Sequence, residues 1–265
     1  MTVSSVFRRC AEDGRGALVG YLPAGYPTVD ASVELLAAMS RDGCDLLEVG
    51  IPYSDPVMDG PTIQAAADTA LRAGFRVRDV FTVVERVAAT GAAIVVMTYI
   101  NPVLRYGVDA FARDLAAAGG LGVITPDLIP DEADEWLAAS SRHGLDRIFL
   151  VAPSSTEERI VATARASSGF LYATSTMGVT GARAGVDAAA ARIVARCRPH
   201  TDLPIGVGLG VRSGDQAAEV ASFADAVIVG SAFVSAAERA GAPGAGALAA
   251  ELADGVRRAG LPQPV

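Results

Sequence analysis

Short apolar runs alternate along the chain with longer segments in which apolar side chains recur every three or four residues. A short apolar run bounded by glycine, proline or polar residues is typical of a buried strand, whereas the longer spacing is typical of a helix with one buried face. Val80, Val83, Val84 and Val87 show the helical spacing. The apolar runs predict eight strands, at residues 17–21, 46–51, 93–99, 122–125, 147–151, 170–174, 205–208 and 226–229.

Polar residues that commonly cap helices stand before several of the segments between these strands. The predicted helix starts lie at Thr28 and Asp30, at Asp131, at residues 155–158 and at Asp187. Pro61 suits the first turn of a further helix, because its missing N–H is not needed there.

Strands that alternate with helices predict a parallel sheet with the helices outside it. Eight such units favour a single (β/α)8 TIM barrel over an open doubly wound sheet, and the first strand and loop, residues 17–26, lack the dinucleotide-binding glycine pattern. We therefore expect the α/β class, one domain over residues 1–265 and an extra helix at the N-terminus. Residues 242–250, rich in alanine, glycine and proline, are expected to join the last helices of the barrel.

Composition excludes several classes of function. The net charge of -8, with no long basic run, makes nucleic acid an unexpected partner. No apolar stretch reaches membrane-spanning length, and residues 1–15 lack the apolar core of a signal peptide. The cysteines, Cys10, Cys44 and Cys197, lack metal-site or disulfide spacing, so we expect reduced thiols in a cytoplasmic protein.

The chain contains no lysine, since all 22 basic residues are arginines. A lysine Schiff base, to a sugar carbonyl or to pyridoxal phosphate, is therefore excluded within this chain. The two histidines, His143 and His200, are isolated, so no metal site is predicted. Lyase or isomerase chemistry would have to use carboxylates, tyrosines and backbone dipoles.

Two carboxylates are the main candidates for acid–base chemistry. Glu48 stands near the end of the second predicted strand, and Asp59 lies in the following loop, just before Gly60 and Pro61. A carboxylate on a rigid strand and another on the loop behind it can face each other across a pocket. The alternative is structural: Asp59 would only cap a helix, and Glu48 would only anchor a loop.

Glycine-rich turns follow the last two predicted strands, at residues 206–211 and 230–232. Backbone N–H groups of such turns can bind a phosphate at the barrel mouth, although tight packing turns would use the same residues. Residues 178–185 contain three glycines and are a candidate lid, or only a long connection. Apolar side chains that could line a pocket for an aromatic group are Tyr21, Ile63, Met97, Tyr99 and Tyr172. These residues alone leave another phosphate-binding barrel, such as a sugar-phosphate isomerase, open.

Residues 46–64 resemble the signature around the catalytic glutamate of the tryptophan synthase alpha subunit. Further motifs match the family in the same order across nearly the whole chain, at residues 98–102, 106–107, 126–128, 152–153, 178–181, 208–210 and 230–231. Two departures are Met177, where the family usually has a small hydroxyl residue, and residues 119–122, which lack an expected acidic residue.

The resemblance implies a lyase that cleaves indole-3-glycerol phosphate to indole and glyceraldehyde 3-phosphate in tryptophan biosynthesis. It implies that Glu48 moves protons and that Asp59 accepts a hydrogen bond from the indole N–H. The residues that the resemblance assigns to substrate are Tyr21, Ile63, Tyr99, Tyr172 and Thr180, and those it assigns to phosphate are Gly181, Leu209, Gly210, Gly230 and Ser231.

The resemblance also implies a partner. A beta subunit carrying pyridoxal phosphate would form a heterotetramer of two alpha and two beta subunits, with Pro52, Asp55 and Asn101 near the interface. No cofactor is expected in the present subunit. The alternatives are a stand-alone indole-releasing lyase and a non-catalytic regulatory subunit that keeps the fold.

Overall fold

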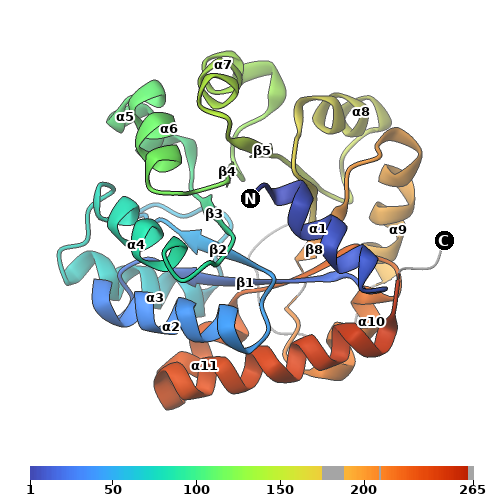
Figure 1. Cartoon of the computed structure of the whole chain (residues 1–265). Coiled ribbons are helices and arrows are strands. Elements are labelled where there is room, and N and C mark those ends of the chain that lie inside the picture. Colours follow the sequence, from blue (N-terminus) through green and yellow to red (C-terminus); the bar gives the residue numbers. More distant parts are fainter. Residues whose placement is uncertain (175–187, 209, 262–265) are drawn as a thin grey trace.

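The computed structural model describes residues 1–174, 188–208 and 210–261. Within these ranges one parallel sheet contains nine strands in the order β5-β4-β3-β2-β1-β9-β8-β7-β6, surrounded by helices (Figure 1). The strands are β1 (Ala17–Pro23), β2 (Leu46–Gly50), β3 (Ile94–Met97), β4 (Gly122–Ile124), β5 (Asp146–Ile148), β6 (Leu150–Val151), β7 (Leu171–Thr174), β8 (Ile205–Gly208) and β9 (Ala226–Val229). The prediction of a TIM barrel is confirmed.

The predicted strand at 147–151 is interrupted in the structure, and its two parts complete the barrel. β5 and β6 are separated by the single residue Phe149. Thr125 N–H donates to the Ile148 carbonyl (3.3 Å) on one side, and Tyr172 N–H donates to the Phe149 carbonyl (3.2 Å) on the other. This short segment therefore connects the two ends of the sheet.

The strand predicted at residues 93–99 ends earlier in the structure than the prediction states. β3 stops at Met97, and Tyr99 is the N-cap of helix α5. The apolar run continues through Tyr99 and Ile100, so the pattern alone extends the strand. Pro102 falls in the first helical turn, where its missing N–H costs nothing.

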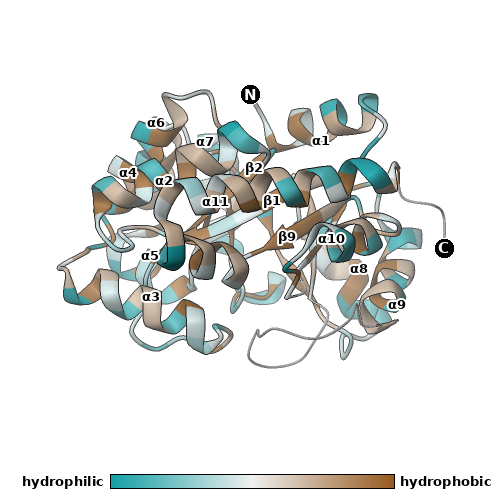
Figure 2. Cartoon of the chain, turned by 90° about the horizontal axis from the view of Figure 1, so that it is seen from below, coloured by the Kyte–Doolittle hydropathy of each residue, from teal (hydrophilic) through white to brown (hydrophobic). Residues whose placement is uncertain are grey.

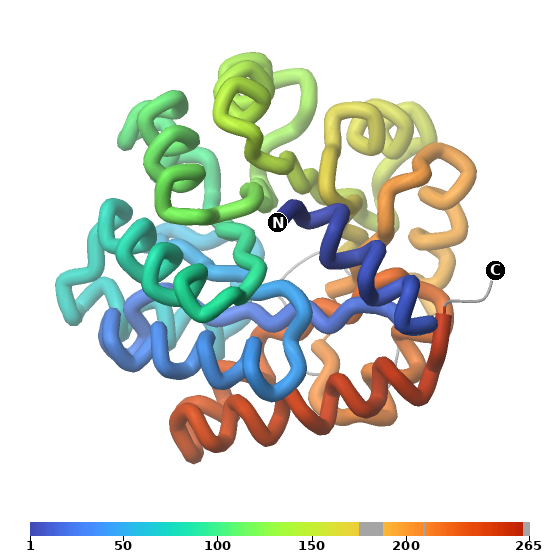
Figure 3. Tube along the Cα trace, viewed as in Figure 1, coloured from blue at the N-terminus to red at the C-terminus, as the bar shows by residue number. Residues whose placement is uncertain are grey.

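Helices cover the outside of the sheet (Figure 3), and among the described residues two connections contain a pair of α-helices. α3 and α4 lie between β2 and β3, and α5 and α6 lie between β3 and β4. The longer helices are α1 (Val3–Glu12), α2 (Val29–Asp42), α3 (Pro61–Arg72), α4 (Asp79–Ala88), α5 (Ile100–Tyr106), α6 (Val108–Ala117), α7 (Asp134–His143), α8 (Glu157–Ala166), α9 (Ala188–Cys197), α10 (Gly214–Ala221) and α11 (Ser231–Ala259), and the 3-10 turns are η1 (Pro130–Glu132) and η2 (Arg198–His200). No described helix is both long and apolar enough to cross a membrane.

The predicted helix starts have mixed outcomes. Thr28 accepts from Ala31 N–H (3.2 Å) and Thr156 accepts from Arg159 N–H (3.3 Å), as expected of capping side chains. Asp131 does not cap a helix, because it lies inside the turn η1, and α7 begins only at Asp134. Asp187 lies outside the described residues.

The extra N-terminal helix closes the amino-terminal end of the barrel. Thr2 and Ser5 form a reciprocal capping box, with backbone-to-hydroxyl distances of 3.0 and 3.1 Å. The buried face of α1 packs against inward-facing strand residues, and the rings of Phe7 and Phe170 are 5.4 Å apart. Figure 1 shows α1 lying across the barrel.

Residues 242–250 do not join two barrel helices. They are themselves helical and lie in the second arm of α11, after a break in helical geometry at Ala240 and Gly241. This arm runs beside α2, so the last helix packs on the second (Figure 3). Figure 2 shows hydrophobic colouring on central β9 and hydrophilic residues on α1 and α11.

Glycines on the strands provide space for two tyrosine rings inside the barrel. A Cβ atom added at Gly50 would overlap the Tyr21 hydroxyl, and one at Gly208 would overlap the Tyr172 hydroxyl. The rings therefore cross the barrel mouth only because the neighbouring strand positions have no side chain.

Gly208→Ala is expected to destabilise the fold by about 1–3 kcal/mol, because the Tyr172 ring must leave its place. Denaturant unfolding measures the loss. Adding Tyr172→Phe, which removes the overlapped hydroxyl, should restore part of it. Equal losses in the single and double variants would contradict this packing.

Candidate active site

Glu48 lies on β2 at the carboxyl-terminal mouth of the barrel, where the working groups of such folds are found. In the strand register it stands between Tyr21 of β1 and Val95 of β3. Alternation along β2 turns Leu46 and Glu48 inward, whereas Leu47 and Val49 pack towards the helices. Glu48 is 1% exposed, so its carboxyl group is held inside the mouth.

One oxygen of the Glu48 carboxyl group, the buried Oε2 atom, has no hydrogen-bond partner among the described residues. Burial, and then the negative charge of Asp59, raise the pKa of Glu48 to about 8. At neutral pH this side chain is therefore mainly a protonated acid, which can donate its proton and later take one back.

Asp59 does not cap the helix that follows it, so the structural alternative for this residue is wrong. The N-cap of α3 is Gly60, which makes no side-chain cap bond, and Pro61 occupies the first helical position as expected. The Asp59 backbone carbonyl accepts from Gln64 Nε2 at 2.7 Å. Burial raises the pKa of Asp59, and a hydrogen bond with the Tyr99 side chain opposes the rise.

The tyrosines close to these acids are neutral phenols. Burial, and then the charges of Asp59 and Glu48, raise the pKa of Tyr21 well above its ordinary value. Burial and Glu48 do the same to the pKa of Tyr172. Both tyrosines thus border the Glu48 carboxyl group, as the sequence predicts for residues at one barrel mouth.

Gly230 lies against the same group of side chains. A Cβ atom added there would be 3.3 Å from Tyr21 Cδ1 and 3.5 Å from Ile63 Cδ1. Gly230 is the N-cap of α11, and Ser231 is its first residue. The glycine turn predicted for phosphate is therefore next to the predicted apolar pocket. Thr180, Gly181, Leu209 and the departure at Met177 lie outside the described residues.

The predicted partner-facing residues follow β2 and β3 on this face. Asp55 and Asn101 are exposed, whereas Pro52 is buried. Ser54 donates to the Asp55 carboxylate at 2.6 Å, and Asn101 Nδ2 donates to the Tyr53 hydroxyl at 2.9 Å. Tyr53 is a contact that the sequence analysis missed, although it lies within the recognised motif.

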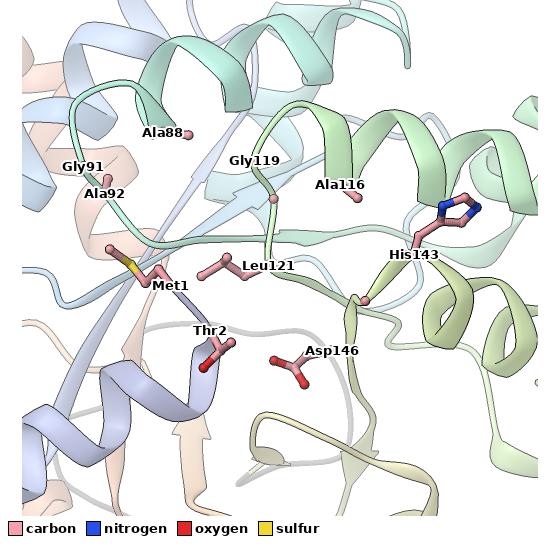
Figure 4. Close-up of a pocket in the computed structure, with 12 residues that line it drawn as sticks. Met1, Thr2, Ala88, Gly91, Ala92, Ala116, Gly119, Leu121, His143 and Asp146 are labelled. Atoms are coloured by element: carbon pink, nitrogen blue, oxygen red, sulfur yellow. The ribbon is translucent and has the colours of Figure 1, made fainter.

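A cavity of about 470 Å³ opens at the opposite end of the barrel (Figure 4). Its wall includes Thr2 at the start of α1, His143 at the end of α7 and Asp146 at the start of β5, with small residues from the ends of α4 and α6. It contains neither Glu48 nor Asp59. This cavity is therefore separate from the predicted site, and among the described residues no three metal-ligating side chains are grouped to hold an ion.

Comparisons with known proteins identify the family. Residues 7–256 match the model of the family described as tryptophan synthase alpha chain. The chain belongs to the tryptophan synthase alpha chain family. A tryptophan synthase alpha chain from Nocardia farcinica is 64% identical over 257 residues, which cover 97% of this chain and 96% of the relative.

Solved structures of tryptophan synthase agree with this assignment. A structure from Mycobacterium tuberculosis has a TM-score of 0.93 and 62% identity, covering 96% of this chain and 98% of that one. A tryptophan synthase complex from Pyrococcus furiosus has a TM-score of 0.83 and 30% identity, covering 90% and 98%. The expected membership of the alpha-chain family, with its lyase role in tryptophan biosynthesis, is confirmed.

Glu48→Gln in this alpha chain is expected to raise the free energy of unfolding at about pH 8. The unfolded carboxyl group ionises near its ordinary pKa of 4.5, whereas the folded one stays protonated up to about 8. The native protein therefore loses stability as pH rises through this window, by at most about 1.4 kcal/mol per pH unit, and glutamine does not.

Urea unfolding between about pH 5 and pH 8 measures the difference between the variant and the native chain. It should widen as pH rises. The matched control is Glu34→Gln on the exposed side of α2, where no such trend is expected. A difference that stays constant would show that Glu48 is not held as a neutral acid.

Proposed function

We propose that Glu48 and Asp59 divide the work of cleaving indole-3-glycerol phosphate into indole and glyceraldehyde 3-phosphate. The observation that carries this assignment is the buried Glu48 Oε2, which has no partner among the described residues and lies near a second carboxylate. Burial raises the pKa of both acids, but the hydrogen bond with Tyr99 opposes the rise at Asp59. Two acids in such different surroundings are typical of an acid–base pair.

The retro-aldol step requires a proton at indole C3 and the loss of one from the glycerol hydroxyl next to the breaking bond. Protonated Glu48 donates to C3, which gives a cationic, indolenine-like ring. The resulting carboxylate removes the hydroxyl proton, the C–C bond breaks, and its electrons return to the indole ring. The aldehyde and indole leave, and Glu48 ends protonated as it began.

Asp59 stabilises the positive charge that develops on the indole N–H. An ionised carboxylate accepts this hydrogen bond best, and the bond from Tyr99 favours the ionised form. We assign Tyr21, Ile63, Tyr99 and Tyr172 to the pocket for the indole ring, and we assign Thr180 to substrate binding by family resemblance.

The substrate phosphate binds where α11 begins. The first N–H groups of a helix have no partner within the helix, and its dipole favours an anion there. Gly230 and Ser231 stand at this end, beside Tyr21 and Ile63. We assign Gly181, Leu209 and Gly210 to the same phosphate site by family resemblance.

We further infer that this chain works with a beta subunit in a heterotetramer of two alpha and two beta subunits. The beta subunit would hold pyridoxal phosphate, for which the present chain offers no lysine. Pro52, Asp55 and Asn101 follow the strands at the mouth, where a partner could receive indole. The alpha chain itself needs no cofactor for acid–base cleavage, and its three free cysteines suit a reducing cytoplasm.

Glu48→Gln is expected to lower indole release by at least about a thousandfold while leaving substrate affinity within a few-fold, because proton transfer is lost and binding groups remain. An indole-release assay with indole-3-glycerol phosphate measures turnover, and calorimetry measures affinity. Glu34→Gln should behave as the native chain. Normal turnover by Glu48→Gln would overturn the assignment, and a lack of stimulation by a beta subunit would favour a stand-alone lyase.

A further inference from the structure

We propose that Asp127 is a positioning residue for Asp59, acting through the start of α5 and the Tyr99 hydroxyl. This inference rests on the proposed function, in which Asp59 stabilises the indole cation. Asp127 follows β4, whereas Asp59 follows β2, so the two residues belong to different loops of the barrel mouth.

Asp127 supplies the cap that α5 lacks. Tyr99, the N-cap residue, makes no side-chain cap bond, and α5 has only seven residues. Such a short helix does not hold its own first turn. The N–H of Ile100, its first residue, donates instead to Asp127 Oδ1 at 2.9 Å. The position of Tyr99 is therefore set from the neighbouring strand.

Tyr99 holds three consecutive residues of the Asp59 loop through one oxygen. Its side chain is 5% exposed, and its hydroxyl oxygen accepts from Val57 N–H at 3.2 Å and from Met58 N–H at 3.0 Å. The Tyr99 side chain also lowers the pKa of the Asp59 carboxyl group through hydrogen bonding, against the rise that burial causes.

The chemistry of the two groups fixes the direction of this last bond. An ionised carboxylate has no proton to donate, so the Tyr99 hydroxyl is the donor. Its oxygen accepts from the backbone N–H groups of the loop at the same time. Tyr99 thereby both places Asp59 and favours its ionised form.

The first turn of α5 reaches the same loop at a second point. Asn101 Nδ2 donates to the Tyr53 hydroxyl at 2.9 Å, and the Tyr53 and Tyr99 rings are 5.3 Å apart. Residues at both ends of the loop 53–59 are thus attached to one helix start. A displacement of that helix start would move the loop as a unit.

The test compares Asp127→Ala with Asp127→Asn in the full-length chain, by steady-state indole release across pH. Alanine removes the acceptor for Ile100 N–H, and asparagine keeps an amide oxygen in its place. We expect Asp127→Ala to lower kcat about tenfold with a smaller effect on KM. Asp127→Asn should recover most of the loss.

The pH profile of kcat distinguishes a loss of Asp59 positioning from a general destabilisation of the fold. Among the described residues, the titratable groups that face Asp59 are Glu48, Tyr21 and Tyr99, since burial and then the charge of Asp59 raise the pKa of each. Of these three, Tyr99 is the one that shifts the pKa of Asp59 in return. When Tyr99 no longer donates a hydrogen bond to Asp59, the ionised form of Asp59 is less stabilised and its pKa rises. The acid limb of kcat should therefore move to higher pH. The alkaline limb, set by Glu48, should stay in place.

A double variant tests the route. If Asp127 acts through the Tyr99 hydroxyl, Asp127→Ala should cause little further loss in a Tyr99→Phe background. Three results would each overturn the proposal. The losses in kcat from Asp127→Ala and Tyr99→Phe would multiply in the double variant, the acid limb of kcat would not move in Asp127→Ala, or Asp127→Asn would lose as much activity as Asp127→Ala.

Asp114→Ala is the matched control, because it breaks the bond from the Tyr106 hydroxyl (2.7 Å) at the other end of α5. It should leave kcat and the acid limb unchanged. Asp59→Asn distinguishes a failure of the proposed role of Asp59 from a failure of the positioning role of Asp127. Full activity in that variant would refute the role of Asp59 itself, whereas an inactive Asp59→Asn with a normal Asp127→Ala would refute only the positioning role.

Discussion

The rest of the site depends on the burial of the Glu48 carboxyl group, one oxygen of which has no partner in the part of the chain that the structure describes. An unpaired polar group in an apolar setting costs free energy, and ionisation would cost more. The barrel supplies the stabilisation elsewhere, through the cores inside and outside the strands. A bound substrate that forms a hydrogen bond with this oxygen removes that free-energy cost. The barrel mouth is therefore suited to binding a polar ligand.

Rigid and adjustable parts of the site have different origins. Glu48 is fixed by a strand paired on both sides, and the glycines at 50 and 208 let tyrosine rings cross the mouth. Asp59 has no such support from its own element. It depends on Tyr99, which lies on a short helix start whose own cap comes from another loop. Glu48, which transfers protons and needs a fixed position, is thus on the sheet. Asp59, which binds the indole ring of the substrate, is on a loop held in place by side chains of other elements.

The sequence pattern predicts the barrel and places Glu48 correctly, because strand burial and alternation are local properties of the chain. It predicts Pro61 at a helix start but leaves the function of Asp59 open, since capping depends on which of two adjacent residues takes the N-cap. It extends the third strand to Tyr99 because that residue is as apolar as a strand residue. The bond from Ile100 to Asp127 joins residues 27 positions apart, and no local pattern reveals such a pair. The interruption at Phe149 likewise depends on strands on both sides of it.

The helix that closes the amino-terminal end of the barrel is synthesised before all the described strands, and yet its binding surface is complete only after β9 has formed. The Phe7 ring of α1 packs on Phe170, and α1 shares one buried cluster with Ala226 and Ile228 of β9, which pairs with β1. During synthesis on the ribosome, the apolar face of α1 therefore stays uncovered until the strands up to β9 have emerged. Contacts this distant in sequence slow folding, because a long loop must close before they form. We therefore expect α1 to dock late in folding, after the strands of the barrel have paired.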